Sequence, residues 1–258
     1  MLSPMKVCFA LPLLLLAVGC DDPAAKPAPS ATPSVRAVAT TAPILPSADP
    51  VEAPKPVVKR ECKSGSQVDF ADAEVEAEAR RKLQKEKGAL TTADLAKVKS
   101  LKLSSVSLDS LDNCVFPHLK SVQGLFFGRG KITNLEPLSE LNTLLDLKLA
   151  YNPVVDVTPL SELSKLDRLD LGHTQVRDLK PLAALTELTD LQLDDTPVDD
   201  LTPLSALTKL EKLSIQRTRV KDLKPLKSIK SLKFVYINGA PIDEPFAISR
   251  QGLKVVDQ

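Results

Sequence analysis

The sequence has no tryptophan and two tyrosines, and aromatic residues make up 3% of its 258 residues. Proteins that hold single-stranded nucleic acid stack the bases on aromatic side chains, and this chain has few rings to offer. Its formal net charge is +1, so the overall charge gives no sign of the basic face that nucleic-acid binding usually requires. We therefore expect no nucleic-acid partner.

The common signatures of catalytic and metal sites are also missing. The stretch from Gly124 to Lys131 reads GLFFGRGK. A phosphate-binding loop, in contrast, has four residues between its first glycine and its Gly-Lys pair, and a serine or threonine directly after that pair. Here five intervene and Ile132 follows. The five aspartates between Asp190 and Asp200 lack the spacing of a calcium loop, and the two histidines have no paired cysteines beside them. We expect no enzyme, no metal and no cofactor.

Leucine, in contrast, recurs with a step of 22 residues. The same phrase begins at Ile132, Val154, Val176, Val198, Val220 and Ile242. In one unit the apolar positions are Val176, Leu179, Leu182, Leu185, Leu188, Leu191 and Leu193. The last step, of two residues, predicts a short strand whose leucines share one face. The steps of three favour a tight 3₁₀ or extended return rather than a long α-helix.

Proline and aspartate also recur at fixed positions of the unit. The prolines are Pro137, Pro159, Pro181, Pro203 and Pro225. Proline interrupts a continuing helix but suits the first position of a short one. The aspartates three residues before four of these prolines are Asp156, Asp178, Asp200 and Asp222. We expect their carboxylates to accept backbone N–H groups at the start of each turn, a structural role rather than a catalytic one.

The pattern LxLxxTxVxDLxPLxxLxxL resembles the 22-residue leucine-rich repeat of bacterial internalin-like proteins. The resemblance implies an α/β fold class: a right-handed curved solenoid with parallel strands on its concave face and a thin convex side. The family's asparagine, which ties successive turns together, is present here only as Asn152. The later units have Thr174, Thr196, Thr218 and Ala240 at this position, and we expect the threonine hydroxyls to continue the ladder with weaker bonds.

The N-terminus has the features of an export signal. A lysine and an apolar run of about a dozen residues precede Cys20, a run too short to span a membrane as a mature helix. The ending from Ala17 to Cys20 resembles the lipobox of bacterial lipoproteins, which implies cleavage after residue 19 and diacylglycerol and acyl modification of Cys20. An ordinary secretory signal is the alternative, and translation starts at Met1 or Met5. Residues 20–58 are rich in proline and alanine and predict an extended, disordered tether.

The repeats, at residues 101–241, need covered ends. Residues 59–100 predict a helical N-terminal cap, with one helix over the segment before Gly88 and a second opened by a capping box at Thr91 to Asp94. Residues 242–258 predict a C-terminal cap. In an exported protein the even pair Cys62 and Cys114 suggests a disulfide, with two separate thiols as the alternative.

The outward side chains of the strands are free of core packing, and we expect them to form the functional surface. Tyrosine and arginine are enriched in protein interfaces. The candidate contact residues on the concave face are Tyr151, Arg168, Asp170, Asp190, Gln192, Arg217, Phe234 and Tyr236. The sequence thus predicts a monomeric protein of the bacterial cell envelope, held to an inner or outer membrane by its lipid alone, that binds a protein partner. A structural element that binds peptidoglycan or another glycan is the alternative.

Overall fold

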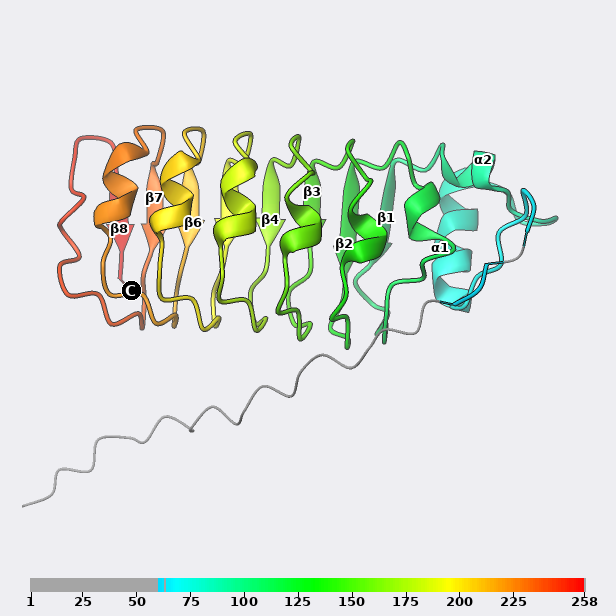
Figure 1. Cartoon of the computed structure of the whole chain (residues 1–258), viewed down its shortest axis with the longest axis horizontal. Helices are drawn as coiled ribbons and strands as arrows, with labels where there is room; N and C mark the ends of the chain where they lie inside the picture. The colour runs from blue at the N-terminus through cyan, green and yellow to red at the C-terminus, as the bar shows by residue number, and fades with distance from the viewer. Residues whose placement is uncertain (1–59, 63, 258) are drawn as a thin grey trace, which may run out of the picture. The chain divides into compact units, whose positions relative to one another are not determined.

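The computed structural model describes residues 60–62 and 64–257, and its strands form one parallel sheet in chain order. The strands are β1 Ser100–Leu103, β2 Gly124–Phe127, β3 Asp146–Lys148, β4 Arg168–Asp170, β5 Asp190–Gln192, β6 Lys212–Ser214, β7 Phe234–Tyr236 and β8 Lys254–Val256. Figure 1 shows them side by side, with one short helix per repeat on the other side of the stack. This is the leucine-rich-repeat solenoid that the 22-residue period predicts.

Between β1 and β7, each return runs through a 3₁₀ helix whose second residue is proline. These helices are η1 Phe116–His118, η2 Glu136–Leu138, η3 Thr158–Leu160, η4 Lys180–Ala184, η5 Thr202–Ala206 and η6 Lys224–Ser228. Aspartates 156, 178, 200 and 222 each accept the backbone N–H two residues later, at 2.8 to 2.9 Å. The structural role predicted for these aspartates is confirmed.

The core is a continuous column of aliphatic side chains between the strands and the 3₁₀ helices. In the unit that starts at Val176, each of the seven predicted apolar positions is 0 or 1% exposed. Burying one such side chain contributes about 1.5–3 kcal/mol. Because each unit packs on its neighbours, the repeats hold one another in place.

The asparagine and the threonines in the turns after the strands make different hydrogen bonds. Asn152 is 1% exposed and reaches the preceding repeat: its Nδ2 donates to the carbonyl of Gly128, and its Oδ1 accepts from the N–H of Ile132. Thr174 and Thr196 donate only to carbonyls three residues earlier in their own repeats. The prediction that threonine continues the ladder is therefore wrong, because its short side chain does not reach the neighbouring turn.

The N-terminal cap covers the first strand with an α-helix, α1 Ala73–Leu83. Asp72 caps its start, and Glu78 on its inner side accepts the backbone N–H of Lys102 in β1 at 3.2 Å. The helix ends before Gln84, which takes the left-handed conformation (φ 51°). The helix thus ends at Leu83, five residues before Gly88, whereas the sequence predicted that it would continue up to that glycine.

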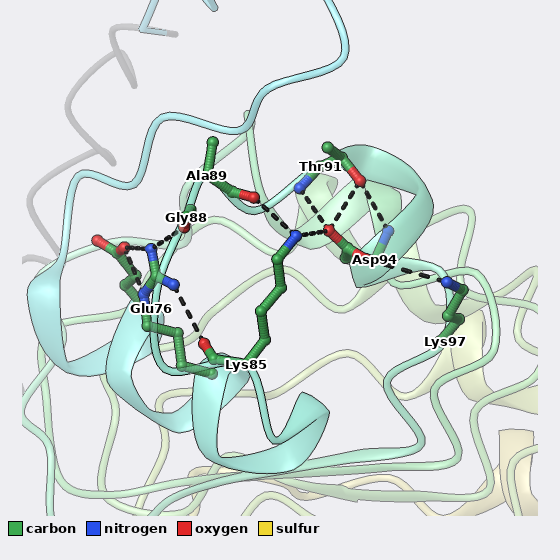
Figure 2. A network of polar contacts seen from close by, with 8 residues as sticks. Glu76, Lys85, Gly88, Ala89, Thr91, Asp94 and Lys97 are labelled. Atoms are coloured by element: carbon green, nitrogen blue, oxygen red, sulfur yellow. Dashed lines mark hydrogen bonds and ion pairs between the residues drawn. The ribbon is translucent and has the colours of Figure 1, made fainter.

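A second helix, α2 Thr92–Leu95, begins with the predicted capping box between Thr91 and Asp94. Figure 2 shows Lys85, from the loop after α1, reaching the Asp94 carboxylate at 2.8 Å and the carbonyl of Ala89. The hydrogen bond from Lys85 holds the pKa of Asp94 well below its usual value. These contacts join the loop after α1 to α2.

The described part of the N-terminal cap is also joined covalently to the first repeat. Cys62 and Cys114 form a disulfide, with their Cα atoms 5.4 Å apart. Beside it, Arg60 donates to Asp112 Oδ2 at 2.8 Å, and Asn113 donates to the carbonyl of Arg60. The bond therefore holds the segment before α1 against the loop that enters η1.

At the C-terminal end, β8 adds to the sheet beside β7 after a loop that contains Phe246, whose side chain is 78% exposed. Within the described residues no helix is long and apolar enough to cross a membrane. The expected signal peptide, the lipidation site Cys20 and the tether all lie outside the described residues, so these expectations stay predictions.

Candidate functional site

The outward side chains of the strands, together with those of the turns that directly follow them, form an ordered surface, here called the strand face. Because the strands pair in register, residues 22 apart stand in rows across the sheet. One row contains Asp146, Arg168, Asp190, Lys212 and Phe234, and the next contains Phe126, Lys148, Asp170, Gln192, Ser214 and Tyr236. Ser214 is the exception to the outward pattern, since it is 4% exposed and donates to Asp194.

Four of the predicted contact residues meet in a shallow depression of the strand face, here called the charged hollow. It has a volume of about 160 Å³ and is lined by Asp146, Lys148, Arg168, Leu169, Asp170, Asp190 and Gln192. Arg168 pairs with Asp146 at 2.9 Å, and Lys148 pairs with Asp170 at 3.2 Å. Neighbouring strands thus contribute opposite charges, which fix the long side chains in place.

The carboxylates of the charged hollow are not fully compensated. Burial raises the pKa of Asp146, against the lowering effect of the Arg168 charge. Asp190 pairs through Oδ2 with Lys212 at 3.3 Å. Its Oδ1 is buried and has no hydrogen-bond partner among the described residues. A buried acceptor without a donor is unfavourable, so a donor supplied from outside would be stabilised here.

A second group, here called the edge ladder, runs along the turns that follow the strands. It contains Arg129, Tyr151, His173, Asp195 and Arg217. The rings of Tyr151 and His173 stack with centroids 4.1 Å apart, and the Arg129 guanidinium lies 5.0 Å from the Tyr151 centroid. His173 Nε2 lies 3.2 Å from Asp195 Oδ2, and Arg217 donates through Nε to Asp195 Oδ1 at 2.7 Å.

The backbone of this ladder is strained. Tyr151, His173, Asp195 and Arg217 have φ between 53 and 63°, a left-handed conformation that costs a side-chain-bearing residue about 1–2 kcal/mol. Gly239, at the same position of a later repeat, adopts it without strain (φ 71°). Four successive repeats thus place a residue other than glycine in the left-handed conformation that glycine adopts most readily. Backbone strain of this kind is often found at functional positions.

The charges of the ladder are tightly held. The hydrogen bond from Arg217 keeps the pKa of Asp195 below its usual value, and the same bond raises the pKa of Arg217. Arg217 is thus held by Asp195, while 51% of its side chain stays exposed.

A third group lies on β7. Phe234 and Tyr236, here called the aromatic pair, stand with ring centroids 6.5 Å apart and nearly parallel planes. The Lys212 ammonium lies 5.8 Å from the Tyr236 centroid, and that of Lys254 lies 5.8 Å from the Phe234 centroid. Half-buried rings flanked by cations suit contacts that combine apolar area with a negative charge.

The acidic group between Asp190 and Asp200 does not form a metal site. Asp194 accepts from Ser214 and from the backbone of Gln216, and Asp199 pairs with Arg177 at 2.5 Å. Among the described residues, no three His, Cys, Asp or Glu side chains are grouped in a way that could hold a metal ion.

The structure thus distributes the eight predicted contact residues over the charged hollow, the edge ladder and the aromatic pair. Sequence reasoning did not single out Arg129, although it lies 22 residues before Tyr151 and the repeat period was enough to find it. Lys254 follows Phe234 by only 20 residues, so no periodic signal marks its place over that ring. His173 and Asp195 are not among the predicted contact residues, and only the stacking of His173 on Tyr151 and its pairing with Asp195 bring them into the site.

Comparison with known proteins gives matches among solved structures alone. No protein-family model matches the chain, and no curated protein sequence matches it. Internalin C2 from Listeria monocytogenes is similar at 26% identity and a TM-score of 0.68, over 77% of this chain and 100% of that one. An internalin, inlF, from the same organism is similar at 26% identity and a TM-score of 0.57, over 67% of this chain and 58% of that one.

A leucine-rich-repeat protein from Leptospira interrogans shares the fold at 17% identity and a TM-score of 0.52, over 63% of this chain and 49% of that one. The chain therefore has a leucine-rich-repeat fold of the internalin type. These likenesses support a bacterial leucine-rich-repeat protein whose repeats form an interaction scaffold.

Proposed function

We propose that this chain is a lipid-anchored protein of the bacterial cell envelope that binds another protein through its strand face. The observation that carries the proposal is the charged hollow, where Asp190 keeps a buried oxygen without a donor beside the desolvated carboxyl of Asp146. A partner side chain with N–H groups would satisfy that oxygen after the Asp190 carboxylate turns to face it, and would recover the energy of desolvation.

The rest of the strand face has the composition of a protein interface. Arg168 is 60% exposed, and Tyr151 is 43% exposed. Arginine and tyrosine are the side chains on which interface energy most often concentrates. The ion pairs between strands preorganise these side chains, so a partner that binds them pays less entropy for ordering.

The envelope location rests on the sequence. The apolar run and the lipobox-like ending at Cys20 support export and lipidation, and the tether of residues 20–58 would let the repeats reach a partner away from the lipid. Mass spectrometry of the N-terminal peptide tests this: a diacylated Cys20 supports the anchor, whereas a free N-terminus produced by cleavage at another bond rejects it.

The aromatic pair favours a second candidate, a structural role in binding peptidoglycan or another glycan. Sugar rings pack their C–H faces on aromatic side chains, and Phe234 and Tyr236 stand nearly parallel on the strand face. The low aromatic content of the chain, 3%, places this candidate second.

One experiment separates the two candidates. The fragment from Lys59 onward is used as bait in native envelope extract and, separately, is sedimented with purified cell wall. A variant with Arg168→Ala, Arg217→Ala and Tyr236→Ala serves in parallel. Capture of a protein by the native fragment and its loss by the variant support protein binding. Sedimentation of the native fragment with cell wall, weaker for the variant that lacks Tyr236, with no protein captured, supports the glycan candidate.

A further inference from the structure

A cavity larger than the charged hollow lies away from the strand face. It has a volume of about 500 Å³ and is formed by the start of α1, the loop that follows β1, and the 3₁₀ helices η1 and η2. No residue that lines it belongs to a strand. Cavities of roughly 300–1,000 Å³ are the usual size for ligand sites. The proposed function gives this cavity no role.

The walls of the cavity combine apolar and acidic groups. The apolar part includes Phe70, Val75, Leu108, Leu111 and Phe116. The carboxylates that line it are Asp72, Asp109, Asp112, Glu136 and Glu140, against a single cation, Arg60. The cavity therefore joins apolar contact area to an excess of negative charge, which favours a ligand that is both apolar and cationic.

These carboxylates differ in how far they are already compensated. Asp112 accepts from Arg60 and from the backbone N–H of Ala71, so it belongs to the wall. Glu140 pairs with Lys120 at 2.7 Å, and this contact lowers the pKa of Glu140. Glu136, in the first turn of η2, is exposed and has no ion pair among the described residues. Its charge is the one most available to a ligand.

The lining of the cavity also contains a donor without an acceptor, on Arg60. Arg60 Nε is buried and has no acceptor within the described part of the chain. Buried N–H groups in proteins are nearly always paired. A carbonyl oxygen brought in beside the guanidinium would pair it after a small rotation of the arginine side chain.

We propose that this cavity is a second binding site, which takes a short peptide segment with a lysine or arginine next to apolar side chains. The peptide's apolar side chains pack on Phe70 and Leu108, its cation pairs with Glu136, and one of its carbonyls accepts from Arg60. A peptide supplies all three kinds of group within a few residues. The site lets the N-terminal cap hold one segment while the strand face binds another protein.

The test titrates a fluorescein-labelled Leu-Lys-Val-Leu peptide with the purified full-length protein and follows fluorescence anisotropy. A Leu-Glu-Val-Leu peptide with the same label is the charge control. The lysine peptide should bind, and its affinity should fall as salt is added, because the contact with Glu136 is screened by ions. The glutamate peptide should bind at least tenfold more weakly, since it meets like charges at the rim.

Two variants and two matched controls locate the binding. Ala71→Trp places a large side chain in the cavity while keeping the backbone bond to Asp112, and it should abolish binding. Glu136→Lys should weaken binding about tenfold, the effect of a like charge at a contact. Ala77→Trp, at an exposed position of α1, and Glu162→Lys, at an exposed position one repeat beyond Glu140, lie outside the cavity lining and should leave binding unchanged.

Three results would overturn this proposal: no binding of the lysine peptide, equal binding of both peptides, or binding that survives Ala71→Trp. The outcome is independent of the strand face, because a protein with Arg168→Ala, Arg217→Ala and Tyr236→Ala should still bind the peptide. A loss of peptide binding in that strand-face variant, with the cavity variants unaffected, would assign the peptide to the strand face instead.

Discussion

Asn152 is the side chain on which the junction between its repeat and the preceding one depends most. The two N–H groups of its Nδ2 are shared among the carbonyls of Gly128, Leu149 and Ala150, and its Oδ1 accepts from the N–H of Ile132. Asn152→Ala removes these contacts and leaves the backbone groups facing an apolar interior. Thr196→Val, a change that keeps the side-chain shape at the same position two repeats later, removes one bond to the carbonyl of Leu193.

Asn152→Ala should lower the free energy of unfolding several times more than Thr196→Val. A buried backbone group left without its partner costs about 1–3 kcal/mol. Asn152 is the side-chain partner of two groups in the preceding repeat, the Ile132 N–H and the Gly128 carbonyl. Because both groups lose that partner, Asn152→Ala should lower the free energy of unfolding by about 2–5 kcal/mol. Thr196→Val should lower it by about 1 kcal/mol.

Urea denaturation followed by far-ultraviolet circular dichroism measures both changes at equal protein concentration. Asn152→Thr serves as the intermediate, since it reproduces the side chain of the later repeats and keeps one donor. The reasoning predicts that stability falls from native protein to Asn152→Thr to Asn152→Ala. An Asn152→Ala protein as stable as Thr196→Val would refute it, because the bonds to the preceding repeat would then contribute nothing.

Three further changes test the covalent and electrostatic parts of the structure. Reducing the bond between Cys62 and Cys114, which are 52 residues apart, should lower the free energy of unfolding by about 4 kcal/mol; equal urea midpoints with and without reductant would contradict this. Burial raises the pKa of Asp146 above its usual value of 3.8, so its carboxylate destabilises the fold once the pH exceeds that raised pKa. At neutral pH, Asp146→Asn should therefore unfold at a higher urea concentration than the native protein. Well below pH 3.8 this difference should disappear. The pKa of Asp195 is lowered by Arg217, so that pair stabilises the fold above pH 3.8 and the stabilisation is lost as the pH falls through the lowered pKa; Arg217→Gln should reduce this loss, and parallel pH profiles of the two proteins would count against the pairing.

Much of the fold was predictable because the same pattern of apolar residues and proline recurs in successive repeats. A step of two between Leu191 and Leu193 marks a strand in each unit, and Pro181 and its equivalents mark where each return helix begins. The end of α1 was not predictable in the same way. Gln84 adopts a left-handed conformation that is usually found at glycine. Its backbone N–H donates to carbonyls of the last helical turn, and the helix end at this residue does not follow from residue preferences alone.

The site was predictable in position but not in organisation. Alternation along the strands placed Arg168 and Tyr236 on the surface, but it could not show which neighbours they contact. The charged hollow arises because strands 22 residues apart bring Asp146, Arg168 and Asp190 side by side in one row. The cavity at the N-terminal cap lay beyond sequence reasoning, because it forms between α1 and helices η1 and η2, which follow no common period.

The central claim is that the strand face is the surface that binds a protein. The most direct measurement is the affinity of the protein captured from envelope extract for three forms of the chain, by calorimetric titration. These are the native chain, the strand-face variant Arg168→Ala, Arg217→Ala and Tyr236→Ala, and a helix-side control with Lys180→Ala, Thr202→Ala and Lys224→Ala. We predict that the strand-face variant binds at least a hundredfold more weakly, as expected when about 3 kcal/mol is lost, while the control binds like the native chain. Equal affinities for the native and strand-face forms, with a loss in the helix-side form, would contradict the account.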